Sequence, residues 1–277
     1  MDIGSLSHTL QFEAESGIWS VGESLAVSYP DDGNEKCFAL EDASFWFRHR
    51  NRCLVSVVKR FPPSGLILDV GGGNGYVTRG LIDAGFPTVL LEPGRVGALN
   101  ARTNRGVRDV ICATVGACRF QPGSVPAIGL FDVLEHIEDD SGFVSLLHQI
   151  LEPRGLLYIA VPAHQWLWSL SDVDAGHYRR YNLQQLIALL SPTFDVLYST
   201  YFFQALTGPF YLMRTLPFNL GLAERRDAAD YVAEHSAGER RGLSAALAWL
   251  LAREFAAIES GRTLTTGTSC LLVARRR

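Results

Sequence analysis

The sequence is poor in cysteine, and none of its cysteines is spaced for a metal site or a disulfide framework. It has five, an odd number without a C-x-x-C pair: Cys37, Cys53, Cys112, Cys118 and Cys270. Zinc knuckles and a disulfide scaffold are therefore not expected. The set Asp172, Asp174 and His177 has no spacing typical of a metal site either. We expect no bound metal and a reducing compartment, the cytoplasm.

A leader and long apolar runs are also lacking. Residues 1–11 contain no basic segment followed by an apolar one, so they do not predict a secretory signal. The most apolar stretch, 202–218, is interrupted before it reaches the ~20 residues that a membrane-spanning helix needs. The interrupting residues are Gly208, Pro209, Arg214 and Pro217. This stretch could pack on the core, cover a hydrophobic substrate or make peripheral contact with a membrane.

An excess of basic charge is lacking too. The chain has 25 Lys and Arg against 29 Asp and Glu, a net charge of -4, and only the short tail 274–277 is basic. A nucleic-acid partner is therefore not expected. With 277 residues, of which 47% are hydrophobic, the chain is long enough for one well-packed domain that carries an insertion.

The sequence does contain a glycine-rich stretch, 66–78, around which the rest is arranged. Apolar residues interrupted by Asp69 predict a short buried strand at 66–70, the glycines predict a tight turn, and residues 76–84 predict a helix. Glycine lets backbone N–H groups approach a ligand closely, and the helix N-terminus adds partial positive charge. This order of strand, glycine loop and helix predicts a ligand site.

The spacing of the glycines distinguishes two kinds of cofactor. A dinucleotide fingerprint G-x-G-x-x-G starting at Gly71 requires a third glycine at position 76, which is Tyr76. The pattern D-x-G-x-G-x-G is met by Asp69, Gly71, Gly73 and Gly75. In this pattern the stretch resembles the first motif of the class I, Rossmann-like S-adenosylmethionine-dependent methyltransferases. A nicotinamide-dependent oxidoreductase is the alternative.

Two further features strengthen the resemblance. About 20 residues beyond the loop, the strand 88–92 ends in Glu92, where a carboxylate can accept hydrogen bonds from both ribose hydroxyls. Residues 127–140 resemble the fourth strand and following turn of the branch of small-molecule methyltransferases with a Leu-Glu-His-Ile motif, here at 134–137. The resemblance implies S-adenosylmethionine as the cofactor and these cofactor-binding residues: Asp69, Gly71, Gly72, Gly73, Gly75, Glu92 and Phe131.

The resemblance also implies the fold: α/β, with a Rossmann-like sheet of seven mostly parallel strands and an antiparallel last strand. The N-terminal part predicts short strands at 18–21 and 25–29, a turn at 30–34 and one helix from 41 to 60. We divide the chain into an N-terminal cap and lead-in helix (1–61), a methyltransferase core (62–201), a helical apolar insert (202–266), and the last core strand with a basic tail (267–277).

Two histidines are candidate catalytic residues. His136 follows the fourth strand and could be a general base or a turn residue that bonds to backbone. His177 lies in the loop 162–181 beside Asp172 and Asp174, where a carboxylate could orient its ring and raise its basicity, or where the charges could simply hold the loop. We expect His177 to serve the reaction more directly than His136.

The loop 162–181 is also the expected substrate wall, because it follows the carboxyl end of a strand, where ligands bind in open α/β sheets. Its substrate-binding candidates are Trp166, Trp168, Asp172, Arg180 and Tyr181. Aromatic rings and arginines fit a ring or sugar with an anionic group, and the apolar insert suggests an attached lipid. We favour O-methylation of a small or lipid-linked molecule. Nitrogen and carbon acceptors, and a non-catalytic scaffold, stay open, and the oligomeric state is unknown.

Overall fold

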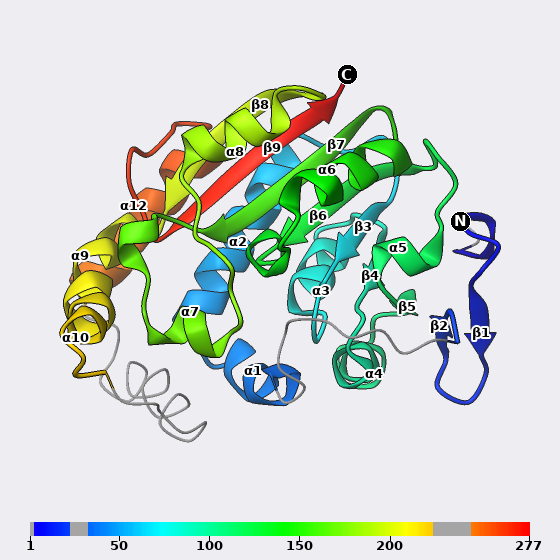
Figure 1. Cartoon of the computed structure of the whole chain (residues 1–277), viewed down its shortest axis with the longest axis horizontal. Helices are drawn as coiled ribbons and strands as arrows, with labels where there is room; N and C mark the ends of the chain where they lie inside the picture. The colour runs from blue at the N-terminus through cyan, green and yellow to red at the C-terminus, as the bar shows by residue number, and fades with distance from the viewer. Residues whose placement is uncertain (1–2, 23–32, 224–244) are drawn as a thin grey trace.

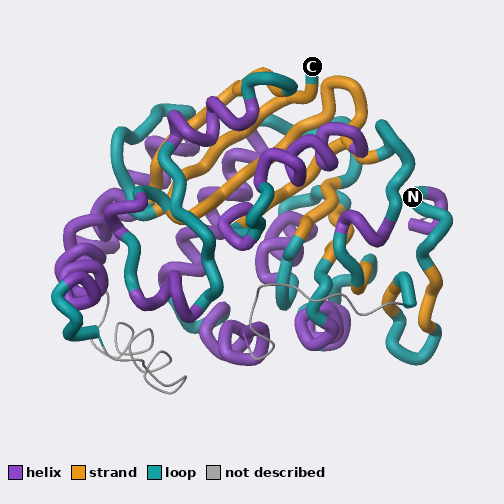
Figure 2. The backbone as a smooth tube through the Cα atoms, in the orientation of Figure 1, coloured by secondary structure: helices purple, strands orange, loops and turns teal. Residues whose placement is uncertain are grey.

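The chain forms a single nine-stranded sheet with helices on both sides (Figures 1 and 2). The computed structural model describes residues 3–22, 33–223 and 245–277. The strand order is β1-β2-β5-β4-β3-β6-β7-β9-β8. In chain order the strands are β1 (Gln11–Glu13), β2 (Ile18–Ser20), β3 (Ile67–Val70), β4 (Thr88–Leu91), β5 (Val110–Cys112), β6 (Val125–Phe131), β7 (Leu151–Pro162), β8 (Phe194–Phe202) and β9 (Ser269–Arg276).

The prediction of seven strands is wrong for the sheet as a whole. The hairpin β1–β2 extends it, because β2 pairs in parallel with β5 at the edge where the predicted sheet would have ended. The other seven strands, in the sheet order β5-β4-β3-β6-β7-β9-β8, form the mostly parallel arrangement that the resemblance implies. The antiparallel last strand is confirmed, since β9 lies antiparallel between β7 and β8.

The helices cover the two faces of the sheet in separate groups. Those on one face, α5, α6 and α8, pack on side chains such as Leu68 and Leu130, and those on the other, α2, α3 and α12, pack on Ile67 and Phe131. Alternation of side chains along each strand explains this two-sided burial.

The helices are α1 (Gly33–Glu41), α2 (Phe45–Arg60), α3 (Tyr76–Asp83), α4 (Arg95–Thr103), α5 (Val115–Cys118), α6 (Asp140–Ile150), α7 (Leu170–Asp174), α8 (Leu183–Leu190), α9 (Thr207–Phe210), α10 (Leu216–Asn219) and α12 (Ala245–Glu259). Shorter helical turns are η1 (Ile3–Ser5), η2 (Leu134–His136), η3 (Gln165–Leu167), η4 (Gln204–Leu206) and η5 (Tyr211–Thr215).

The N-terminal helices differ from the prediction. The expected single helix over 41–60 is wrong: α1 ends at Glu41, and α2 begins at Phe45 because the Ser44 hydroxyl accepts a hydrogen bond from the Trp46 N–H at 3.2 Å and caps it. The predicted turn at 30–34 is corrected at its last two positions, since Gly33 and Asn34 belong to α1. The predicted strand 25–29 lies outside the described residues.

A helical segment joins β8 to β9 and is tied to the core by one buried carboxylate. Glu254 of α12 accepts hydrogen bonds from the backbone N–H groups of Phe203 and Gln204, each at 2.7 Å. Its Oε1 also lies 2.8 Å from His49 Nε2 on α2. Glu254 therefore links α12, α2 and the end of β8 at a buried point.

Replacing Glu254 with alanine is expected to destabilise the fold by about 3 kcal/mol, because two N–H groups and His49 lose their partner inside the protein. Urea unfolding at neutral pH measures this change. Glu259→Ala, at the exposed end of the same helix, is the control and should change stability by less than about 0.5 kcal/mol. Equal effects of the two substitutions would show that Glu254 does not hold the insert.

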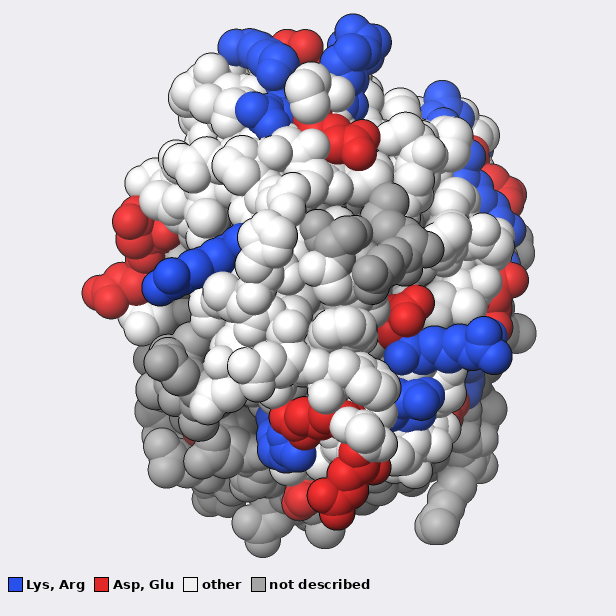
Figure 3. Space-filling view, turned by 90° about the vertical axis from the view of Figure 1, so that its right-hand side faces the viewer, with Lys and Arg blue, Asp and Glu red and all other residues white. Residues whose placement is uncertain are grey.

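On the face at the β1 edge, basic and acidic side chains are interspersed (Figure 3). No helix in the described ranges combines the length and apolar character needed to cross a bilayer.

Candidate active site

The glycine loop joins β3 to α3 and has backbone angles that favour glycine. Gly71, Gly73 and Gly75 have φ values of 67°, 56° and 79°. A Cβ on Gly71 would lie 2.7 Å from Val133 Cγ2, and one on Gly72 would collide with Leu90. The loop therefore passes close to its neighbours in a conformation that glycine adopts readily, and its contact with a ligand stays a prediction.

Glu92, directly after β4, faces this loop. Its carboxylate accepts hydrogen bonds from the N–H groups of Gly73 at 2.9 Å and Gly94 at 2.7 Å. Burial raises the pKa of Glu92, and the same N–H groups oppose this rise by stabilising the ionised form. The structure thus brings the predicted ribose-binding acid and the glycine loop together.

Helix α1 lies over the loop, which sequence reasoning missed. The Asn34 side chain donates to Glu92 Oε1 at 3.5 Å, and Asn74 Nδ2 donates to the Asn34 carbonyl at 2.8 Å and to Glu41 Oε1 at 3.2 Å. The only local signal was Asn74 itself, a polar residue among the loop glycines. Periodicity could not have found Asn34, because its contacts are with residues about 40 to 60 positions away.

Asp69 is fully buried at the base of the glycine loop, with Oδ2 close to Gly72. Its Oδ2 accepts a hydrogen bond from the Thr78 hydroxyl at 2.5 Å, while Oδ1 has no hydrogen-bond partner among the described residues. Burial raises the pKa of Asp69 to about 6, and the Thr78 bond opposes that rise. Asp69 therefore fixes the first turn of α3 on β3, and its contact with cofactor stays a prediction.

The turn after β6 connects the glycine loop with the loop of His177. Phe131, the last residue of β6, is buried over Gly129, and its contact with cofactor stays a prediction. Asp132 adopts φ 61° and forms an ion pair with Arg50 at 2.6 Å. Val133 contacts Gly71, and Tyr178 N–H donates to the Glu135 carbonyl at 2.8 Å. The ion pair with Arg50 was not predicted, because nothing local links α2 to this turn.

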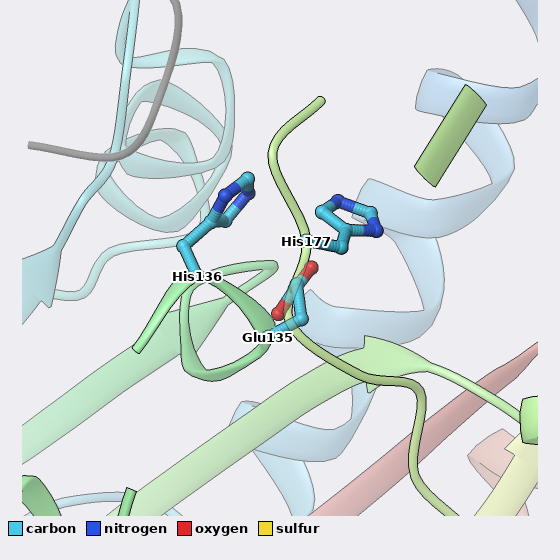
Figure 4. A group of neighbouring side chains, drawn as sticks. All are labelled: Glu135, His136 and His177. Atoms are coloured by element: carbon cyan, nitrogen blue, oxygen red, sulfur yellow. The ribbon is translucent and has the colours of Figure 1, made fainter. Parts of the chain in front are cut away.

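Glu135, His136 and His177 form a cluster at this turn: the two imidazoles lie side by side, and in Figure 4 the Glu135 carboxylate lies below them. Glu135 is fully buried, and neither carboxylate oxygen has a hydrogen-bond partner among the described residues. Burial, with nearby Asp132, raises the pKa of Glu135 well above its usual value. The rings of His136 and His177 lie 4.7 Å apart. One donor atom from each of the three lies within 4.8 Å of the others, a donor set that could hold a transition-metal ion.

His177 is oriented by Asp172. Its Nδ1 lies 2.9 Å from Asp172 Oδ1, which also accepts a hydrogen bond from Arg180 Nε at 2.7 Å. Burial opposes ionisation of Asp172, but the bonds from His177 and Arg180 outweigh it and lower the pKa of this carboxyl. An ionised carboxylate only accepts hydrogen bonds, so Nδ1 of His177 carries a proton, and in the neutral form of this tautomer the lone pair is on Nε2.

The other predicted substrate residues divide into two groups. The Arg180 guanidinium is buried against Asp172 and the Ala163 carbonyl, and the Tyr181 hydroxyl donates to Asp140 Oδ2 at 2.8 Å, so both hold the loop. Trp166 is 52% exposed beside His164, and Trp168 is half-buried. Contact with the acceptor stays a prediction for Trp166, Trp168, Asp172, Arg180 and Tyr181.

Replacing His136 with glutamine is expected to make the fold less sensitive to acid. Burial, together with nearby His177, lowers the pKa of His136 from 6.5 to about 4 in the folded chain. A group whose folded pKa is depressed contributes stability that is present above its unfolded pKa and lost as the pH falls through its folded pKa. Between pH 7 and pH 4 the native sequence should therefore lose about 3 kcal/mol relative to His136→Gln.

Urea unfolding of both proteins across this pH range checks the expectation. His8→Gln, an exposed histidine near the N-terminus, is the control and should keep the native pH dependence. Identical pH slopes for the native chain and His136→Gln would contradict the depressed pKa.

The chain was compared with protein families and with curated proteins. Residues 41–196, more than half of the chain, match the family model described as "Methyltransferase domain". A probable S-adenosylmethionine-dependent methyltransferase of Mycolicibacterium smegmatis is 23% identical over 168 residues, covering 60% of this chain and 65% of that protein. An uncharacterized methyltransferase of Mycolicibacterium gilvum is 30% identical over 116 residues, covering 40% and 45%. The match spans less than two thirds of each relative.

Solved structures share the fold. A methyltransferase in complex with the Haloferax volcanii Trm112 methyltransferase activator aligns with TM-score 0.57 and 15% identity, covering 91% of this chain and 99% of that one. The Haemonchus contortus phosphoethanolamine N-methyltransferase 2 bound to S-adenosylmethionine aligns with TM-score 0.52 and 17% identity over 90% and 58%. The [4+2]-cyclase SpnF aligns with TM-score 0.51 and 17% identity over 82% and 81%. At these identities the likeness concerns the fold alone.

Proposed function

The chain belongs to the methyltransferase-domain family, and from this premise we propose that it transfers a methyl group from S-adenosylmethionine to an oxygen atom of a small or lipid-linked molecule. The cofactor is S-adenosylmethionine. The residues present fit it: the glycine loop, with its positive φ values, lies beside the buried carboxylate of Glu92, and that carboxylate can accept hydrogen bonds from a ribose.

Two observations support this proposal over the alternatives that the sequence left open. The nicotinamide cofactor was already disfavoured by Tyr76, which stands where the dinucleotide fingerprint needs a glycine. A non-catalytic scaffold would have no need for an oriented, proton-accepting group beside the loop. The Asp172–His177 pair is such a group, and it is the single observation that carries the proposal of catalysis on an acceptor hydroxyl.

The protein's part in the reaction is to orient the acceptor and to take its proton. When bound, the cofactor supplies an electrophilic methyl group. Nε2 of His177 accepts the proton of the acceptor hydroxyl, and Asp172 stabilises the imidazolium that results. His136 has its pKa lowered to about 4, so it is neutral at physiological pH and does not repel that imidazolium.

The position of the pair supports its role beside the cofactor loop. The turn 132–136 lies between the glycine loop and the loop that carries His177. Val133 contacts Gly71, and the Glu135 carbonyl accepts a hydrogen bond from the N–H of Tyr178, next to His177. The pair is thus linked to the loop through one short turn. Proximity of this kind is what methyl transfer requires from the enzyme, since positioning supplies most of the catalysis.

The test has two parts. Calorimetric titration of the full chain with S-adenosylhomocysteine and with NAD should give binding of the first alone; binding of NAD alone would overturn the assignment. Cofactor labelled in its methyl group is then incubated with the chain and with lipid and water-soluble cell extracts. Label released from the product by treatments that cleave methyl ethers or esters is expected, and label on nitrogen or carbon would overturn O-methylation.

A further inference from the structure

The segment between β8 and β9 presents apolar side chains to solvent at one end of the molecule. In Figure 1, α9, α10 and α12 lie together at the left edge, and α12 packs against η4, which precedes α9. We call the exposed large apolar side chains of these helices, of η5 and of the turn after α10 the apolar face. Its members are Leu212, Met213, Leu220, Leu222, Trp249 and Leu250.

The first part of α12 explains why this face is unusual. Residues 245–250 are all apolar, and five of the six are exposed, with Trp249 at 56%. An ordinary surface helix has one apolar stripe toward the core and a polar face toward water. Here the apolar residues surround the helix: Leu247 is half-buried against the core, and the other five residues face solvent. A helix that is apolar on all sides is usually buried, so this surface is unusual for a face turned to water.

In the described stretches 202–223 and 245–253, which contain the apolar face, the charges have one sign; farther along α12, Glu254 is buried and Glu259 is exposed. Between 202 and 223 and between 245 and 253, Arg214 and Arg253 are the charged residues, and neither range contains Asp or Glu. Each arginine lies over an aromatic ring, Arg214 over Phe210 at 5.2 Å and Arg253 over Trp249 at 4.6 Å. Aromatic rings paired with cations are typical of the interface between lipid tails and phosphate headgroups.

The same segment contacts the loop that carries His177. The Thr215 hydroxyl donates to the Leu167 carbonyl at 3.0 Å, the rings of Tyr211 and Trp166 lie 5.9 Å apart, and Phe210 lies under the guanidinium of Arg180 at 4.9 Å. Whatever the apolar face binds is therefore held beside the proposed acceptor site.

We propose that the apolar face docks on the surface of an anionic lipid bilayer without crossing it. Leu212 and Trp249 enter the acyl boundary, and Arg214 and Arg253 pair with headgroup phosphates. The docking itself does not depend on the reaction. Its consequence for the reaction, that the acceptor is the lipid-linked class of molecule, rests on the proposed function.

Flotation with vesicles tests the docking. The full chain is mixed with vesicles of phosphatidylcholine alone or with one fifth phosphatidylglycerol, and we expect most of it to float with the anionic vesicles at low salt. Leu212→Asp and Trp249→Asp should each weaken this binding at least about tenfold. Each removes an apolar side chain that the bilayer would bury and adds a negative charge that the anionic headgroups repel. Arg214→Gln and Arg253→Gln should each weaken it about fivefold.

The control is Phe12→Asp, a side chain of matched exposure (55%) on β1 at the opposite end of the molecule, which should float as the native chain does. Calorimetry with S-adenosylhomocysteine on each variant reports the cofactor site separately, so failure to dock and failure of the proposed function give different results. Absence of flotation of the native chain overturns the proposal. So does a stable oligomer that Leu212→Asp dissociates, since this face would then be a subunit contact.

Discussion

Replacing His177 with alanine is expected to lower turnover by about 100-fold or more while leaving S-adenosylhomocysteine affinity nearly unchanged, which is the usual size of a general-base contribution. The reason is geometric. Asp172 Oδ1 lies 2.9 Å from Nδ1 of His177 and accepts its proton, so in the neutral ring the lone pair on Nε2 is available to accept the proton of the acceptor. Turnover is measured with the acceptor that the labelling experiment identifies, and affinity by calorimetry.

Two variants separate the base from its surroundings. Asp172→Asn should also lower turnover, because an amide can turn its NH₂ toward Nδ1 and favour the wrong tautomer of His177. His136→Ala is the matched control: it removes the neighbouring ring, 4.7 Å away, and should mainly reduce stability or cofactor binding. If His136→Ala loses the turnover and His177→Ala keeps it, the two roles are reversed.

Replacing Glu92 with alanine is expected to weaken binding of S-adenosylhomocysteine by about 100-fold. A ribose hydroxyl bonded to a buried carboxylate contributes about 1.5–3 kcal/mol, and Glu92 can accept from two of them. The substitution also leaves the Gly73 and Gly94 N–H groups without their acceptor, so the loop loses its fixed position. Calorimetric titration of the purified variant measures the loss.

Glu41→Ala is the matched control for this experiment. Glu41 is equally buried, accepts a hydrogen bond from Asn74 of the same loop and pairs with Arg105 at 2.9 Å, but it does not contact Glu92 or the loop N–H groups. We expect the affinity of Glu41→Ala for S-adenosylhomocysteine to change less than about threefold. We also expect thermal unfolding to give a similar loss of stability for Glu41→Ala and Glu92→Ala. Equal losses of affinity would mean that Glu92 acts only through the stability of the loop.

The sequence by itself determined the features that depend on neighbouring residues. The glycine loop followed from residue spacing, because a positive φ at Gly71, Gly73 and Gly75 requires glycine wherever the loop is placed. The start of α8 is local in the same way, because Asn182 and Gln185 bond reciprocally across one turn. The position of Glu92 followed from the length of one strand–helix–strand unit, which sets how far the next strand end lies along the chain.

Only the tertiary structure decided which distant groups meet. Asn34 reaches Glu92, Arg50 reaches Asp132, and His136 reaches His177, through separations of 58, 82 and 41 residues in the sequence. The secondary-structure propensity of a residue carries no information about such pairs, because it depends on neighbouring residues and not on a distant partner. The hairpin β1–β2 was underestimated for the same reason: a three-residue strand is too short to predict pairing, and β2 is fixed only by the edge that β5 offers.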